Sequence, residues 1–176
     1  MKMRILTAAI GAAWLFVGAA SAQQPPAPPN LDAIPEKMPW DTPYGPPINA
    51  EKAQAAIAAA AAEAKKRGWA LDIAVVSGAG YLIAFLRMDN AQIASIAIAE
   101  HKARAAAKFR RPTKVFEDAV MKGGLMYILT LDDVIASRGG IPLIENDKLI
   151  GAIGCSGGTG SQDEVVCQAG AATVNK

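Results

Sequence analysis

Two tight-turn signals, each placed between strand-like segments, constrain the fold of this chain most strongly. One is the Ser-Gly-Ala-Gly run at residues 77–80, and the other is Asn146-Asp147, whose residue types tolerate positive φ. The segments around these turns are residues 69–76, 81–87, 141–145 and 148–155. Because short turns join antiparallel strands, the sequence predicts two β-hairpins and no parallel βαβ unit.

Alanine-rich segments before, between and after the hairpins predict helices. Residues 50–67 follow Asn49, a good N-cap, and precede Gly68, a common C-terminal stop. Three further helices are predicted over residues 91–109, from Thr113 to residue 122, and from a Ser161-x-x-Glu164 capping box to about residue 174. The predicted fold class is α+β, with one central antiparallel sheet flanked by helices.

The prolines lie almost entirely outside this predicted domain. Nine of the 11 fall in residues 23–47, where they disfavour helix and strand and predict an extended arm. Trp40 and Tyr44 interrupt the arm, so it either docks on its own domain or on a neighbouring subunit, or it is disordered. The folded domain is predicted to span residues 48–176.

The first 22 residues have the pattern of a secretory signal peptide. Lys2 and Arg4 precede an uncharged stretch over residues 5–18, and Ala20-Ser21-Ala22 forms a small-x-small cleavage site. The apolar run is short for a bilayer span, although an uncleaved N-terminal anchor is the alternative. We therefore expect a periplasmic or secreted protein with no membrane span after cleavage.

The charge balance does not favour a nucleic-acid partner. The leader holds two of the 18 basic residues and none of the 16 acidic residues, so the mature chain would be neutral.

Cys155 and Cys167 could form a disulfide in an oxidising compartment, or they could be two buried thiols. A single histidine, with no surrounding ligand cluster, does not indicate a zinc site.

Residues 154–158 match the Gly-x-Ser-x-Gly pattern of a hydrolase nucleophile elbow. That mechanism needs a histidine after Ser156 in the chain, and none follows. The same loop could bind an anion at a helix N-terminus, but Asp163 and Glu164 place negative charge there. We favour a glycine loop that is needed for backbone geometry.

A basic run without acidic residues covers residues 102–114. Within it, Arg104, Lys108 and Arg111 have the spacing of one helix face. This face is either a solvated surface or a grip for carboxylates such as the propionates of a tetrapyrrole. His101 is a candidate iron ligand, although a lone histidine on a helix is commonly an ordinary surface residue. Other side chains that could ligate iron are Met88, Tyr81 and Tyr127.

Several blocks, taken in order, resemble the GlcG/HbpS haem-binding family. They are AVVSGAGYLIAFLRMD at residues 74–89, Ser95, KARAAAKF at 102–109, GGIPL at 139–143, GAIGCSGG at 151–158, QDE at 162–164 and AG at 169–170. The resemblance runs through the chain from about Ile48 onward. It implies a profilin-like domain that forms homo-oligomers and, in some members, binds haem non-covalently.

The resemblance also directs attention to particular residues. Thr113 is a candidate ligand, because hydroxyl ligation of haem has been proposed within the family. The candidates for one shared pocket are Arg87, Met88, Asp89, Lys102, Gly157, Gly158 and Thr159. The chain departs from the family pattern at Ser77, Asn90 and Cys155, where Asp, Gly and Val are common.

Three functions are compatible with these features. The first is an exported haem-binding protein, in which basic residues such as Arg104 hold the propionates, with a role in haem handling or redox stress. The second is a ligand-free oligomeric accessory module for an exported oxidoreductase. The third is a small enzyme acting on an organic acid, with Arg87 or Lys102 holding the carboxylate and Asp89 moving a proton.

Overall fold

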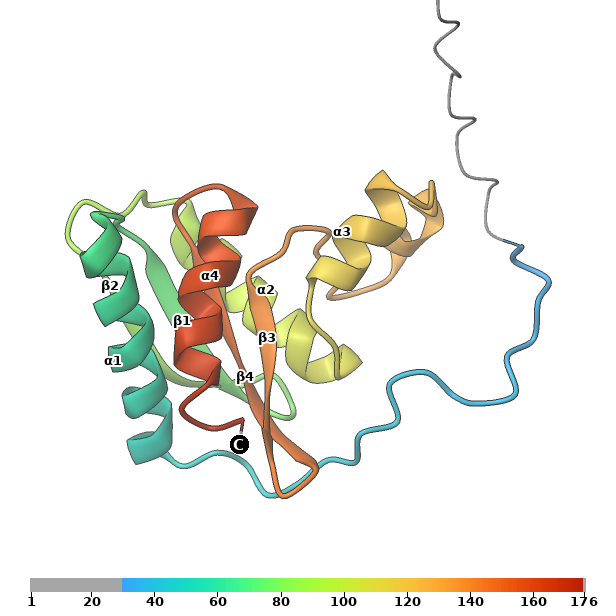
Figure 1. Ribbon diagram of the computed structural model, residues 1–176, viewed down its shortest axis with the longest axis horizontal. Helices are drawn as coiled ribbons and strands as arrows, with labels where there is room; N and C mark the ends of the chain where they lie inside the picture. The colour runs from blue at the N-terminus through green and yellow to red at the C-terminus, as the bar shows by residue number, and fades with distance from the viewer. Residues whose placement is uncertain (1–29, 176) are drawn as a thin grey trace, which may run out of the picture.

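The computed structural model describes residues 30–175, so the predicted leader and the first part of the arm lie outside it. Its elements are α1 (Ala50–Arg67), β1 (Asp72–Ser77), β2 (Leu82–Arg87), α2 (Ser95–Phe109), α3 (Lys114–Met121), the 3-10 helix η1 (Met126–Thr130), β3 (Gly140–Glu145), β4 (Lys148–Ser156) and α4 (Gly160–Ala171). The predicted α+β class is confirmed, and Figure 1 shows the helices arranged around one sheet.

The sheet is antiparallel throughout and has the strand order β2-β1-β4-β3. Both predicted hairpins are present. The β3–β4 turn places Asn146 at φ 49° and Asp147 at φ 58°, the left-handed conformation that these residue types tolerate. Strands β1 and β4 are central, and every residue of β1 is buried because helices cover both of its faces.

The two faces of the sheet are covered differently. Helices α1 and α4 pack over one face and enclose the larger apolar core, whereas α2 lies on the other face (Figure 1). The α2 interface is built mainly from alanines, and a Cβ added to Gly154 of β4 would lie 2.2 Å from the Ala99 carbonyl oxygen. Small side chains therefore let α2 approach the sheet closely, which explains the alanine-rich sequence.

Helix ends confirm some sequence signals and correct others. Asn49 caps α1 by accepting a hydrogen bond from the Lys52 N–H (2.9 Å), and Gly68 ends the helix at φ 71°. Helix α2 begins at Ser95 rather than at residue 91. The capping box of α4 is formed by Thr159 and Gln162, so the prediction placed it two residues too late.

The arm docks on its own domain. The Leu149 N–H donates to the Pro43 carbonyl, the Gly45 N–H donates to the Leu149 carbonyl and the Ile48 N–H donates to the Ile150 carbonyl, each at 2.8 Å. These contacts place the arm beside the start of β4, on the side that β1 covers further along. Of the alternatives for the arm, intramolecular docking is thus observed for residues 43–48.

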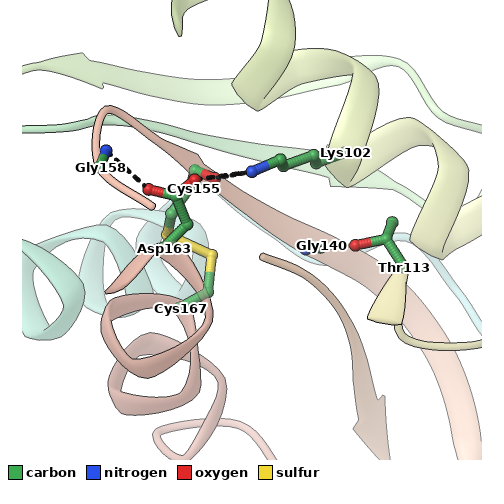
Figure 2. Close-up of a disulfide and its surroundings, with 7 residues drawn as sticks. All are labelled: Lys102, Thr113, Gly140, Cys155, Gly158, Asp163 and Cys167. Carbon is green, nitrogen blue, oxygen red and sulfur yellow. Dashed lines mark hydrogen bonds and ion pairs between the residues drawn. A yellow bond between two sulfur atoms is a disulfide. The ribbon is translucent and has the colours of Figure 1, made fainter. Parts of the chain in front are cut away.

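Cys155 and Cys167 form a disulfide that joins β4 to α4, with 5.7 Å between their Cα atoms (Figure 2). Both cysteines are fully buried in the core.

Within residues 30–175, no helix combines the length and the apolarity that crossing a bilayer requires.

Candidate functional site

A cavity of about 720 Å³ lies between the arm, the β1–β2 turn and the C-terminal half of α2. Its lining consists of Tyr44, Gly45, Pro47, Ser77, Gly78, Ala79, Tyr81, Ile83 and Lys108. Most of these groups are apolar or aromatic, and three of the nine residues belong to the arm. The cavity therefore depends on the docked arm, which supplies one of its walls.

The arm wall is held through Tyr44. Its hydroxyl donates to the Lys108 carbonyl oxygen at 2.8 Å, and the Arg110 guanidinium lies over its ring, 5.5 Å from the ring centre. Arg110 also donates to the Thr42 carbonyl at 3.2 Å. Lys108 and Arg110, both from the cationic run of the sequence, therefore hold the arm, one through its carbonyl oxygen and the other through its guanidinium group.

Positive charge borders the cavity. Lys108 Nζ and Arg104 Nε share the Asp133 carboxylate at 2.5 Å and 2.9 Å, and hydrogen bonding from Lys108 is the main reason that the pKa of Asp133 is lowered. Both cationic side chains pack against the β1–β2 turn, since a Cβ on Gly80 would lie 2.9 Å from Arg104 Cγ and 3.2 Å from Lys108 Cε. Two cations against one carboxylate leave a net positive charge of one in this trio.

Tyr81 provides the aromatic group of the opposite wall, and its side chain is largely exposed (76%). In residues 30–175, no hydrogen bond occupies its hydroxyl. None of the described residues that line the cavity is a histidine, cysteine or methionine. Apolar walls, two phenol rings and a neighbouring cation suit a flat, largely apolar ligand with an acidic group.

The residues predicted to share a pocket lie elsewhere. Asp72 of β1 is in register with both Arg87 of β2 and Ser156 of β4, so the loops that follow those two strands meet at one end of the sheet, as expected. This end is opposite the cavity, because Tyr81 precedes β2 and Arg87 ends it. Arg87 donates to the Ala91 carbonyl at 3.4 Å.

Lys102 does not join that exposed loop cluster. Its side chain is 1% exposed, and Nζ donates to Asp163 Oδ2 at 2.7 Å and to the Cys155 carbonyl at 3.2 Å (Figure 2). Burial raises the pKa of Asp163, and the Lys102 ammonium and the Gly158 N–H oppose that rise. In this chain Lys102 is a structural cation that links α2 to β4 and α4.

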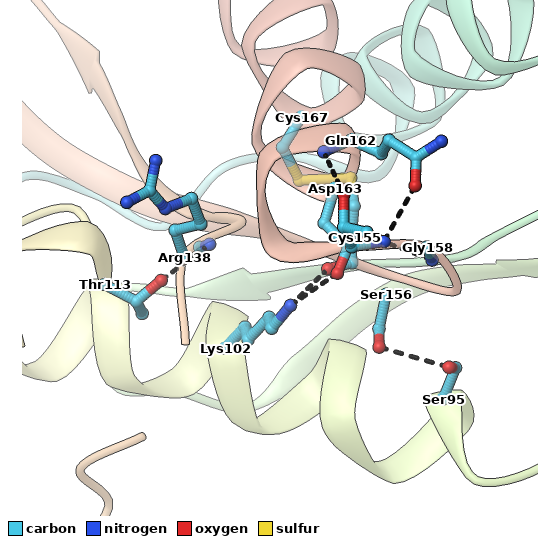
Figure 3. A network of polar contacts seen from close by, with 12 residues as sticks. Ser95, Lys102, Thr113, Arg138, Cys155, Ser156, Gly158, Gln162, Asp163 and Cys167 are labelled. Carbon is cyan, nitrogen blue, oxygen red and sulfur yellow. Dashed lines mark hydrogen bonds and ion pairs between the residues drawn. A yellow bond between two sulfur atoms is a disulfide. The ribbon is translucent and has the colours of Figure 1, made fainter. Parts of the chain in front are cut away.

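The N–H groups of the glycine loop after β4 already donate hydrogen bonds to side chains of α4. The Gly158 N–H donates to Asp163 Oδ1 at 3.0 Å, and the Thr159 N–H donates to the Gln162 side chain at 2.8 Å (Figure 3). Ser156 is buried and donates to Ser95 Oγ at 3.1 Å, with no histidine in that network. These contacts favour the structural interpretation of the loop over a nucleophile elbow or an anion site.

Four of the five predicted iron ligands lie away from the cavity, whereas the fifth, Tyr81, lines it. Thr113 is fully buried, and its hydroxyl accepts a hydrogen bond from the Gly140 N–H at 2.9 Å instead of capping α3. His101 is partly exposed on α2, Met88 packs against the larger core and Tyr127 is exposed on η1. None of these four side chains is among the lining residues.

The predicted cationic helix face is divided by the end of α2. The helix stops at Phe109, and Arg110 adopts a left-handed conformation at φ 54°. Arg111 therefore leaves the helix and lies over the Trp40 and Phe116 rings, at 5.2 Å and 5.8 Å from the ring centres. Arg104 and Lys108 remain together, whereas Arg111 contacts the arm.

Sequence reasoning missed Tyr44, Gly45 and Pro47 as site residues, although Tyr44 stood out as an aromatic residue among prolines. It also missed Asp72. The Asp72 side chain is fully buried, and neither of its carboxylate oxygens has a hydrogen-bond partner among the described residues. Burial raises the pKa of Asp72, and the charge of Arg87 opposes that rise.

Comparisons with known proteins agree with this architecture. Protein GlcG of Escherichia coli is 39% identical over 109 residues, which cover 62% of this chain and 81% of that protein. The crystal structure of HbpS superposes with a TM-score of 0.70 at 26% identity, covering 80% of this chain and 99% of that one. The PduOC:haem complex has the same fold, with a TM-score of 0.66 at 24% identity and coverage of 73% and 96%.

The family assignment follows from the extent of the match. A sequence model described as haem degrading protein HbpS-like matches residues 48–172, which include every helix and strand in the described part of the chain. The chain therefore belongs to the HbpS-like family.

Proposed function

We propose that this protein is exported and binds haem non-covalently in the cavity between the arm and the β1–β2 turn. The cavity itself carries the proposal, because it combines apolar walls, phenol rings and a bordering cation. The family description and the haem complex of a protein with the same fold support it. The leader-like residues 1–22 support a periplasmic or secreted location, where the role would be haem handling or a response to redox stress.

The residues present fit the group. Small-molecule sites commonly have volumes of roughly 300–1,000 Å³ and apolar linings with a few polar groups. Tyr44, Tyr81 and Ile83 would contact the macrocycle, and Lys108 would pair with a propionate. When bound, haem would supply a redox-active iron, while the chain would bind, orient and partly shield it.

The test is a titration of the mature chain, residues 23–176, with ferric haemin, followed in the Soret region. We expect a saturable change at about one haem per chain, with a dissociation constant near or below about 1 μM. If protein that is folded by circular dichroism gives no saturable change, haem binding is excluded.

A charge-matched pair of variants locates the site. Lys108→Gln removes the bordering cation and should weaken haemin binding about tenfold, a loss of roughly 1.4 kcal/mol. Lys66→Gln removes a lysine of α1 that is far more exposed (78%) and does not line the cavity, so binding should not change. Equal effects of the two substitutions would contradict binding in this cavity.

An oligomeric accessory module is a second candidate, favoured by the apolar surface around η1. Large apolar side chains are exposed there, and a grouped surface of this kind commonly marks a protein interface. They are Met121, Met126, Tyr127, Leu129 and Leu131. Light scattering tests whether the chain forms homo-oligomers, and a pull-down from periplasmic extract tests for a redox partner. A monomer that captures no partner would exclude this candidate.

A further inference from the structure

A haem in the cavity would require an iron ligand from a side chain that reaches it. This inference rests on the proposed function. Of the ligands that the sequence offers, Tyr81 lines the cavity, and the other four do not: His101, Met88, Thr113 and Tyr127. Thr113 is fully buried, and its hydroxyl already accepts a hydrogen bond.

The lining itself offers two phenols. The hydroxyl of Tyr44 already donates to the Lys108 carbonyl, and that hydrogen bond holds the arm wall in place. The hydroxyl of Tyr81 has no partner within residues 30–175, and its side chain is largely solvent-accessible. Ser77 lines the cavity too, but its hydroxyl accepts a hydrogen bond from the Tyr81 N–H at 3.3 Å.

We propose that the phenolic oxygen of Tyr81 is the protein ligand of ferric haem in this cavity. Tyrosine is an established haem ligand in catalases, so the chemistry has a precedent. On binding, the Tyr81 oxygen would bond to the iron in place of a solvent water or hydroxide, and the phenol would lose its proton to solvent. No electron is transferred in this step, and the iron stays ferric.

The backbone around Tyr81 is well placed for such a ligand. The Tyr81 carbonyl accepts a hydrogen bond from the Ser77 N–H at 2.8 Å, and the Gly80 N–H donates to the Ser77 carbonyl at 2.9 Å. Gly80 has φ 88°, a conformation that suits glycine at this tight turn. A ligand on a closed hairpin is better fixed than one on a free loop.

The local charge also suits an anionic ligand. Arg104 and Lys108 pack against Gly80, the residue before Tyr81, and within residues 30–175 the Asp133 carboxylate is the one that pairs with them. The remaining positive charge would stabilise negative charge on the phenolate oxygen and on the propionates. The positions of Arg104 and Lys108 therefore explain how the cavity could accept both the Tyr81 phenolate and the haem propionates.

The experiment compares the mature wild type with Tyr81→Phe, using Tyr127→Phe as the matched control. Tyr127 is exposed on η1, outside the cavity, so its substitution removes a phenol without touching the site. The readouts are the phenolate charge-transfer absorption and Fe–O(phenolate) resonance Raman bands of the haemin complex. Affinity for iron-free protoporphyrin IX is measured in parallel by fluorescence.

We expect Tyr81→Phe to abolish the phenolate bands and weaken haemin binding about tenfold, while protoporphyrin IX binding changes by less than about twofold. Tyr127→Phe should change neither. A wild-type complex without phenolate bands, or bands that persist in Tyr81→Phe, would overturn the ligand assignment and leave haem binding intact. Failure of the wild type to bind haemin at all would refute the proposed function itself.

Discussion

Lys102 lies in a basic run of the sequence, but its role in the fold is structural. Its ammonium group extends from α2 and joins Asp163 of α4 to the Cys155 carbonyl of β4 (Figure 3). A buried ion pair adds little net stability compared with apolar residues, but removing one partner leaves an uncompensated buried charge. Lys102 therefore matters to folding rather than to ligand binding.

Lys102→Met should lower the free energy of unfolding by roughly 3–5 kcal/mol, because Asp163 then stays buried without its counter-charge. Urea denaturation measures this loss. The double variant Lys102→Met/Asp163→Asn should recover more than half of it, because the amide oxygen can still accept the hydrogen bond from Gly158. A double variant as unstable as the single one would contradict this explanation.

Asp72 links stability to pH. Burial raises its pKa in the folded state. The Asp72 carboxyl therefore contributes most to the free energy of unfolding below the unfolded-state pKa, and that contribution is lost as pH rises through the folded-state pKa. Asp72→Asn removes this dependence and should stabilise the protein at pH 7 by about 1 kcal/mol, the scale for an unsatisfied buried group. Lowering the pH to about 4 should reduce the difference in the free energy of unfolding between the wild type and Asp72→Asn.

The measurement is urea unfolding of wild type and Asp72→Asn across that pH range. Asp32→Asn, in the exposed part of the arm, is the control and should leave the pH profile unchanged. If wild type and Asp72→Asn respond to pH identically, Asp72 does not titrate as a buried, unpartnered carboxyl.

Among the elements, the arm contributes the least usual part of the site. Its described part, residues 30–47, contains no helix and meets the sheet through one isolated bridge, between Tyr44 and Leu149, so a few contacts hold it. Segments with few buried contacts open more readily than core elements. The arm wall should therefore open more readily than the rest of the cavity.

Tyr44→Phe keeps the ring and removes the hydrogen bond to the Lys108 carbonyl. A bond of this kind contributes about 1 kcal/mol, so the open fraction of the arm should rise about fivefold. Limited chymotrypsin digestion at Trp40 reports that rise, and bound haemin should slow the cleavage. Unchanged cleavage would show that the Tyr44 hydroxyl does not hold the arm.

The disulfide ties the last strand to the last helix across a sequence separation of 12. In the chain-entropy account, closing a loop of this size contributes roughly 3 kcal/mol. For a domain of this size, the variant Cys155→Ala/Cys167→Ala should therefore melt roughly 6–12 °C lower. Thermal unfolding by circular dichroism tests this, and a Tm equal to that of the wild type would show that the bond adds no stability.

Local signals predicted the helices and hairpins well because caps and turns depend on near neighbours in the sequence. The exception is instructive, since α4 offers two overlapping capping boxes, one from Thr159 to Gln162 and one from Ser161 to Glu164. The first is used, and it sets Asp163 in the first turn facing Lys102. That choice depends on a contact between residues 61 positions apart, which no local pattern contains.

At the scale of the whole molecule, the two ends of the sheet differ in character. One end brings together the loops that hold Arg87 and Gly157, as the sequence led us to expect, and it also buries Asp72, which the sequence did not indicate. The other end carries the cavity, which was not predicted because it forms only when the arm meets the β1–β2 turn and α2. Family resemblance could indicate the ligand class but not this long-range assembly.

The most direct test of haem binding in this cavity is a crystal structure of mature protein with ferric haemin. The proposal predicts the macrocycle between Tyr44 and Tyr81, with a propionate at Lys108 and the iron at the Tyr81 oxygen. Haem bound instead beside His101, or at the Arg87 and Gly157 end of the sheet, would contradict it.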